Sequence, residues 1–322
     1  MKQAHFIAQR AGRWESYRRQ LKRLRRRRGS DEELATFPAL YRALCNDLAL
    51  ARTRGYSLTL VDELQHQARL GHAYLYQPRQ HLGLAMGRFF GHDFPVLVRA
   101  EWRLCALAGL LLFGPMVWLF WHIGQSPEFV YRVLSADQVT QYQQMYEGKG
   151  GMTRSAEDNL MMFSFYIMNN IGVALRTFGS GLVFGVGSAL ILLINGVQIG
   201  AVAAHLSFAG YQENFVSFVV GHGAFELPAI ALAGAAGARM GLSLLFPGGL
   251  SRRAALRRSA RRAIRLLYGV IAMLIIAAAL EGFWSASAAS VQSKYLVGAF
   301  LWLFVLGYFA GVGRQRGGAG AD

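Results

Sequence analysis

The chain contains little cysteine and little charge for its length. Its 322 residues include two cysteines and 16% charged residues, against 53% hydrophobic ones. Cys45 lies in a stretch of soluble composition and Cys105 at the start of an apolar run, so neither a disulfide framework nor a cysteine metal site is supported. We interpret both as small apolar residues. The low charge argues against an ordinary soluble domain and favours a membrane protein.

Motifs of the common enzyme classes are also missing. The sequence has no His-Glu-x-x-His zinc motif, and it shows no soluble catalytic triad and no nucleotide-binding fingerprint. The glycines between 179 and 187 follow no strand pattern and precede no Lys-Ser or Lys-Thr pair, so they do not predict a phosphate-binding loop. These absences predict a protein that is not an enzyme, with no cofactor and no bound metal.

Acidic residues are scarce relative to basic ones. There are 18 Asp and Glu residues against 34 Lys and Arg, which gives a net charge of +16. The basic residues gather in the first thirty residues and beside apolar runs, where orientation signals belong, so no nucleic-acid partner is expected. Two explanations stay open for the basic N-terminal helix. It binds anionic lipid headgroups, at roughly 1 kcal/mol per basic residue, or it is a solvated face that keeps this end in the cytoplasm.

Long apolar runs are what the sequence does have. About twenty apolar residues in a row are enough to cross a bilayer as a helix. The arginine-rich loop 251–265 must be cytoplasmic by the positive-inside rule, and this fixes the parity of the crossings. We therefore predict an all-α, polytopic helical membrane bundle of about six transmembrane segments, with both termini cytoplasmic. The runs lie at 104–124, 160–178, 181–204, 214–246, 266–283 and 295–312.

Composition divides the chain into two parts and a tail. Residues 1–100 have a soluble composition and are predicted to form a basic, cytoplasmic helical region. Residues 101–316 form the predicted transmembrane domain, with a polar external loop at 125–159, and residues 317–322 are expected to be a flexible tail. A loose apolar stripe of helical spacing runs through the first part. It consists of Phe6, Trp14, Leu21 and Leu24.

The segment 160–178 is the weakest predicted span because it contains Asn169, Asn170 and Arg176. A charge at the centre of a span costs roughly 2.5 to 3.5 kcal/mol on insertion scales, so such residues need partners. Three arrangements stay open for this segment: it spans the membrane, it re-enters, or it lies along the outer interface. Asn195 adds a polar residue to the next run.

The most polar stretch inside a predicted span is 221–228. His222 and Glu226 are four residues apart, so they share one face of a helix. We expect Arg176 or protonated His222 to be the counter-ion of Glu226. Two glycines and a proline weaken regular helical hydrogen bonding here, which predicts a broken helix that faces the bundle interior. These residues are Gly221, Gly223 and Pro228.

Four short motifs lie within the predicted central spans. They are Asn169-Asn170, Asn195-Gly196, Gly221-His-Gly-Ala-Phe-Glu-Leu-Pro-Ala-Ile230 and Ala233-Gly-Ala-Ala-Gly237. Together they closely resemble the stage II sporulation protein M family (SpoIIM, or DUF95 type). The N-terminal pattern is similar to that of the non-sporulating bacterial members. The family often has proline before the histidine, where this chain has Gly221.

The resemblance implies a polytopic protein of the bacterial inner membrane. In spore formers, the family member works with cell-wall-degrading partners during engulfment, as a membrane subunit and not as the hydrolase. The resemblance therefore implies protein partners in a membrane complex and a link to cell-envelope remodelling. Self-association as a homo-oligomer is a further option.

Three functions stay open. In the first, the chain is a scaffold or assembly subunit, and His222 and Glu226 form a buried structural pair. In the second, the polar residues of the central spans form a transport site or a proton relay. The third, an intramembrane metal hydrolase, is disfavoured because one histidine and one glutamate are too few ligands. The spacing of Gly237 and Gly241 favours close helix packing, within the chain or between two copies.

Overall fold

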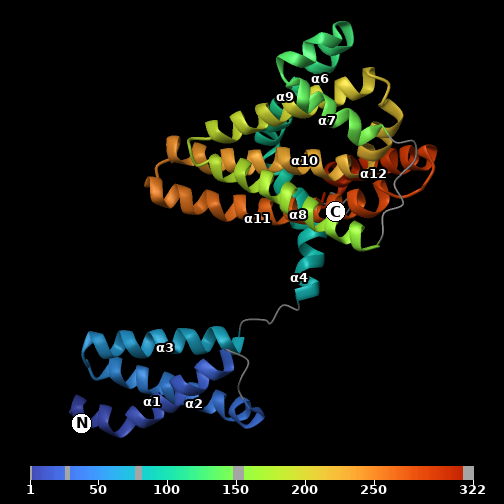
Figure 1. Cartoon of the computed structure of the whole chain (residues 1–322). Coiled ribbons are helices and arrows are strands. Elements are labelled where there is room, and N and C mark those ends of the chain that lie inside the picture. Colours follow the sequence, from blue (N-terminus) through green and yellow to red (C-terminus); the bar gives the residue numbers. More distant parts are fainter. Residues whose placement is uncertain (1, 26–29, 77–81, 148–155, 315–322) are drawn as a thin grey trace, which may run out of the picture. The chain divides into compact units, whose positions relative to one another are not determined.

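The chain folds into two compact helical units, residues 1–82 and 83–322, in the computed structural model (Figure 1). The part of the chain that the structure describes contains no strand, which confirms the all-α class. The predicted tail at 317–322 lies outside the described residues, as does a part of the predicted external loop. The described residues are 2–25, 30–76, 82–147 and 156–314.

The first unit consists of three helices, α1 (Gln3–Arg25), α2 (Asp31–Thr53) and α3 (Leu58–Tyr76). A capping box starts α2: the Ser30 hydroxyl accepts from the Glu33 amide, and the Glu33 carboxylate accepts from the Ser30 amide. These two bonds satisfy backbone donors that a helix start otherwise leaves without partners.

A compact apolar core holds the three helices together. The stripe predicted from the sequence is buried in it, and Tyr17 stacks on Phe37 with ring centroids 5.3 Å apart. Burying a large apolar side chain is worth roughly 1.5 to 3 kcal/mol, so this unit has a core of its own. The buried residues are Phe6, Trp14, Tyr17, Leu21, Leu24, Phe37, Leu44, Ala51, Leu60 and Leu64.

A buried carboxylate connects α1 to α2. The side chain of Asp47 is 3% exposed and accepts from Arg10 Nε at 2.8 Å, Arg13 Nη2 at 2.7 Å and Trp14 Nε1 at 2.9 Å. Three donors compensate the charge for its loss of water. The basic residues of α1 therefore have a structural role as well as a surface one.

The second unit is a bundle of long helices around α10, which contacts α6, α8, α9, α11 and α12. Among the described residues, five helices are long and apolar enough to cross a membrane: α6, α9, α10, α12, and α11 together with η3. In chain order the elements are α4 (Leu82–Arg88), η1 (Phe89–Asp93), α5 (Phe94–Ala100), α6 (Trp102–Gln125), η2 (Pro127–Arg132), α7 (Ala136–Tyr146), α8 (Ala156–Ser180), α9 (Val186–Phe208), α10 (Gln212–Leu245), α11 (Arg252–Ala279), η3 (Leu280–Ser285) and α12 (Val291–Gly311).

The second unit begins before the domain boundary predicted at residue 100. Phe94 of α5 is buried, and its ring lies 5.6 Å from that of Phe309 in α12. Tyr308 donates from its hydroxyl to the Phe90 carbonyl at 2.7 Å. Residues 83–100 therefore belong with the membrane helices, because their aromatic side chains fill the same core.

The segment predicted as the weakest span forms one uninterrupted helix, α8, of 25 residues. It is not among the five helices that are apolar enough to cross a membrane. It nevertheless lies along α10 and α11 (Figure 1). Near its start, the Phe163 ring lies 5.6 Å from that of Phe283, and just after its end Gly181 contacts Gly237. The segment is therefore one straight element packed on the bundle, with no turn inside it.

The helices α6 and α9 run parallel in close contact. Gly196 faces the Leu112 backbone and Gly200 faces Met116, so residue numbers rise together along the two helices. A side chain at Gly196 would collide with the Leu112 carbonyl. Glycine is thus required for this approach, as in other membrane helix pairs.

The predicted break in α10 is wrong, because the helix continues without interruption through 34 residues. Pro228 removes one backbone donor, but the neighbouring helices on all sides hold α10 in place. Gly237 and Gly241 instead allow close packing inside the chain, against the backbone at Phe178 and at Gly181 respectively. Of the two uses predicted for this glycine pair, the structure contains the internal one.

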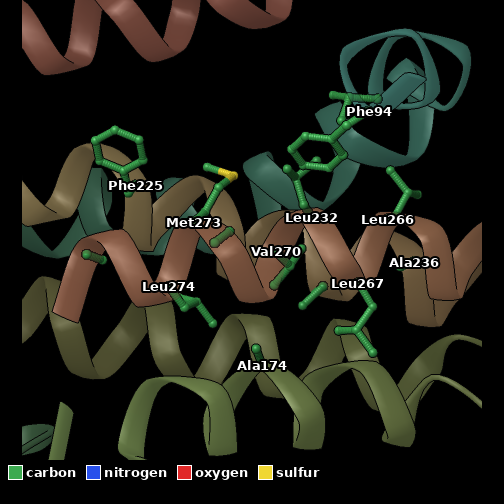
Figure 2. Close-up of a cluster of buried hydrophobic side chains, with 14 of the residues drawn as sticks. Phe94, Ala174, Phe225, Leu232, Ala236, Leu266, Leu267, Val270, Met273 and Leu274 are labelled. Carbon is green, nitrogen blue, oxygen red and sulfur yellow. The ribbon is translucent and has the colours of Figure 1, made fainter. Parts of the chain in front are cut away.

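The main core of the second unit lies between α8, α10 and α11 (Figure 2). Small residues of α10 such as Ala236 face larger ones of α11 such as Leu266. Figure 2 also shows Phe94 reaching this core from α5. Alternating small and large side chains lets the helices approach closely without cavities.

A charged cluster closes the end of the bundle next to the arginine-rich loop. Glu101 is 7% exposed, and its carboxylate lies 3.3 Å from Arg239 Nη1 and 3.9 Å from Arg262 Nη1. Nearby, Asp93 pairs with Arg265 at 2.7 Å. A hydrogen bond from His92 and the charge of Arg265 lower the pKa of Asp93. These pairs connect the α5–α6 junction to α10 and α11.

Candidate functional site

Three ionisable side chains meet where α10 passes the end of α11. They are His222 and Glu226 of α10 and Glu281 of η3. One ring nitrogen of the histidine and one carboxylate oxygen of each glutamate all lie within 4.8 Å of one another. His222 is buried and the two glutamates are partly buried. We refer to these three residues as the His/Glu cluster.

Local backbone geometry explains how the cluster forms. The spacing of four residues puts His222 and Glu226 on one face of α10. The segment η3 is a π-helical turn, a form that is rare and often found at functional sites. It contains both Glu281 and Ser285, and the Ser285 hydroxyl oxygen lies 3.1 Å from His222 Nδ1. The turn thus supplies one carboxylate and one residue that orients the imidazole.

A buried lysine lies beside the cluster. Lys294, near the start of α12, is 7% exposed and donates from Nζ to the Ser285 carbonyl at 2.8 Å. Ser285 therefore contacts both the imidazole and the ammonium group.

The end of α7 covers the cluster. Asn214 donates from Nδ2 to the Tyr146 carbonyl at 2.9 Å, and the Tyr146 ring packs 5.5 Å from Phe215. Phe218 lies between this ring and His222, at 6.2 and 5.4 Å. Burial, followed by the charge of Glu281, raises the pKa of Tyr146 to about 12. The tyrosine hydroxyl therefore keeps its proton at neutral pH and can donate it in a hydrogen bond.

The polar residues predicted on α8 do not pair with Glu226. Asn169 and Arg176 lie on the exposed side of α8, and Arg176 donates from Nε to the Gly172 carbonyl of its own helix at 3.2 Å. Among the described residues no ion pair joins Arg176 to Glu226, so of the two counter-ions expected for Glu226 the structure brings His222 near it and not Arg176. Asn170 is buried and accepts from Asn169 Nδ2 at 3.0 Å.

The polar residues of α9 bond within their own helix or to α7. Asn195 donates from Nδ2 to the Ile191 carbonyl at 2.8 Å, one turn earlier in the same helix. His205 contacts Gln143 of α7 at 3.0 Å. Of the polar residues predicted from the sequence, the structure thus brings His222 and Glu226 into one cluster, while Asn195 bonds within its own helix.

Three residues of the site were missed by sequence reasoning: Glu281, Ser285 and Lys294. Two of the three had a signal in the sequence. Glu281 is a carboxylate inside the apolar run 266–283, and Lys294 directly precedes the run 295–312. Intramembrane ionisable residues are functional candidates by default. Their meeting with His222 depends on the way α10, η3 and α12 pack, which the sequence pattern does not specify.

The arrangement allows two kinds of chemistry. Two neighbouring carboxylates cannot both stay ionised at low cost, so they share a proton or bind a cation. An imidazole at the same place can take part in either. The cluster also brings the number of candidate protein ligands to three, which is one more than the sequence motif supplies.

Comparisons with known proteins place the cluster in a named domain. The family model of stage II sporulation protein M matches residues 104–286, from α6 to just beyond η3, and so contains all three cluster residues. The model of a domain of unknown function (DUF8413) matches residues 4–77, which form the three-helix unit. No curated protein and no solved structure matches the chain. Because the first match covers more than half of its length, the chain belongs to the stage II sporulation protein M family.

Proposed function

We propose that the chain is a non-catalytic assembly subunit of a complex in the bacterial inner membrane, with a role in cell-envelope remodelling. One observation carries this proposal: a three-helix unit with its own core is joined to a tightly packed membrane bundle. Such a construction suits a protein that holds partners at a membrane. The three-helix unit docks soluble proteins, and the bundle anchors it.

The proposed topology has six crossings and both termini in the cytoplasm. Helices α6 and α9 are parallel, so the chain must cross back once between the end of α6 and the start of α9. In the proposed topology, α8 makes this return crossing. The arginines at the start of α11 favour the cytoplasm for the loop after α10. With α8 as a span, each crossing alternates in direction and agrees with this charge signal.

The three-helix unit has a basic groove that suits anionic lipid headgroups. Arg18, Lys22 and Arg25 line it together with apolar and amide side chains from α1 and α3. Each basic residue near an anionic surface adds roughly 1 kcal/mol of binding. In the proposed arrangement this groove holds the unit near the cytoplasmic leaflet, where it meets partners.

Affinity purification from native membranes tests the assembly role. We expect the full chain to retain at least one protein in a fixed ratio, after mild crosslinking and in dilute detergent. Exchanging exposed residues of the three-helix unit should reduce this recovery, whereas exchanging exposed residues of α12 should not. A chain that purifies without any protein in a fixed ratio would contradict the proposal.

Proton relay is a second candidate, and the His/Glu cluster is the observation that favours it. A proton shared among these groups would need a path on both sides of the membrane. Purified chain in liposomes with an internal pH dye tests this. If wild type carries protons and a folded Glu226→Gln variant does not, with Asn195→Ala as the matched control, then relay replaces assembly as the function.

A further inference from the structure

The geometry points to a metal site: we propose that His222, Glu226 and Glu281 bind one divalent transition-metal cation such as Zn²⁺ or Mn²⁺. The inference does not depend on the assembly role, because it concerns what the bundle binds and not which proteins it meets. It rests on the number of ligands, their distances, their chemistry and their charge.

The number of ligands fits a site with room for solvent. Metal sites that keep a position open commonly use three protein ligands with water as the remaining ligand. His222 and Glu226 come from α10, and Glu281 comes from η3, so the cation would join two elements. His222 is buried, and the two glutamates are partly buried.

The distances are close to those of a bound state. Bonds from Zn²⁺ to nitrogen or oxygen are about 2.0 to 2.2 Å, so two ligand atoms on one cation lie about 3 to 4 Å apart. The three ligand atoms of the cluster already lie within 4.8 Å of one another. Small side-chain rotations close the remaining gap, and the helices need not move.

The ligand types select among cations. Ca²⁺ and Mg²⁺ prefer oxygen ligands, whereas imidazole suits zinc, iron, nickel and copper, and carboxylates suit manganese. A mixture of one imidazole and two carboxylates therefore favours a first-row transition metal over Ca²⁺ or Mg²⁺. This is why zinc and manganese are the probes chosen below.

A neighbouring residue orients the imidazole as metal sites require. Metal-binding histidines usually make a hydrogen bond through the nitrogen that does not bind the metal. In this structure Ser285 Oγ lies 3.1 Å from His222 Nδ1, so we assign Nε2 to the cation. The Ser285 carbonyl is held in turn by Lys294 at 2.8 Å, which fixes the orienting residue itself.

The charge of the ligands also suits a cation. Two carboxylates lie within one cluster, and neighbouring carboxylates repel each other when both are ionised. A divalent cation bound between them offsets this repulsion directly. The Phe218 ring packs between His222 and the ring of Tyr146, at the end of α7.

The test uses the full chain, purified in detergent, with any histidine tag removed and bound metal stripped by a chelator. Titration with Zn²⁺ or Mn²⁺ should give one cation per chain by calorimetry and by elemental analysis. Glu226→Gln, Glu281→Gln and His222→Ala should each weaken binding at least tenfold. Glu213→Gln, an exposed carboxylate exchange on the same helix, should leave affinity unchanged.

A second measurement keeps the test valid if a variant is less stable. The cation should raise the melting temperature of the wild type and of Glu213→Gln, but not that of Glu281→Gln, each compared with its own metal-free form. The proposal is overturned if no cation binds in a fixed ratio. It is equally overturned if the cluster variants bind as well as the control, since the cation then sits elsewhere on the surface.

Discussion

Buried charges with several partners are the residues on which each unit depends most. Asp47 in the first unit and Glu101 in the second both connect elements that are distant in sequence. Breaking a buried ion pair costs more stability than an exposed ion pair contributes, because the charge that is left stays desolvated and has lost its partner. Both carboxylates can therefore be tested by an exchange that keeps the shape and removes the charge.

In the first unit, Asp47→Asn should lower the free energy of unfolding by about 2 to 4 kcal/mol, since Arg10 and Arg13 lose their shared partner. Hydrogen exchange of the amides in α1 and α2, measured in the full chain, reports this loss. The matched control is Glu63→Gln, whose pair with Arg18 is about half exposed and worth roughly 0 to 1 kcal/mol. Equal effects of both exchanges would contradict the structure.

In the second unit, Glu101→Gln should lower stability in detergent by about 1 to 3 kcal/mol, because two arginines lose one buried carboxylate. Arg262→Gln should cost less, roughly 0 to 1 kcal/mol, since its side chain is 49% exposed and its contact is 3.9 Å long. Thermal unfolding followed by intrinsic fluorescence measures both. The prediction fails if Arg262→Gln costs as much as Glu101→Gln.

The residues of the candidate site were only partly predictable. His222 and Glu226 follow from one helical turn, because spacing along the chain alone puts them on one face. Glu281 is 55 positions after Glu226 and joins it through packing between helices. Of the two expected counter-ions of Glu226, Arg176 does not join the cluster: it is exposed and donates to the Gly172 carbonyl of its own helix. Helical periodicity predicts neighbours within an element, but it does not predict which faces of two elements meet.

Close helix pairs determine the architecture at the level of elements, and α6 with α9 is the clearest case. Gly196→Ala should lower the melting temperature in detergent, because the added methyl group would collide with the Leu112 carbonyl. Gly109→Ala on α6 has no atom within 4 Å and should be neutral or stabilise by up to about 1 kcal/mol, as alanine favours helix. If Gly196→Ala left the melting temperature unchanged, the close contact between α6 and α9 would have to lie at other residues.

Most of the helical elements were predictable from apolar runs and capping residues. The interpretation of α10 failed because glycine and proline were read as breaks. In this chain they are tolerated, since surrounding helices hold the backbone and the glycines allow close approach. The position of residues 83–100 was missed for a related reason: their composition looks soluble, but Phe94 is buried among membrane helices.

For the whole molecule, the proposed six-crossing topology gives a direct labelling test. Cys45 and Cys105 are first replaced by serine, and single cysteines are then placed at exposed positions Gln141, Val183 and Arg257. Labelling of intact cells with a membrane-impermeant maleimide should modify Gln141→Cys alone. After the cells are opened, all three should react.

The position at 183 decides the role of α8. If Val183→Cys is modified in intact cells along with Gln141→Cys, then α8 does not cross the membrane. Arg257→Cys serves as the control for the cytoplasmic side, because it lies in the arginine-rich start of α11. Modification of Arg257→Cys in intact cells would overturn the proposed orientation altogether.

The parallel pair of α6 and α9 also sets an order of events during synthesis. Gly196 follows its contact residue Leu112 by 84 positions, and by the proposed topology the intervening chain includes a full passage back across the bilayer. When α6 leaves the ribosome, the helix that covers its inner face does not yet exist. The nascent first span must therefore wait in the lipid or against an insertion factor until α9 arrives. Chains truncated before α9 should accordingly be the ones that quality-control proteases remove first.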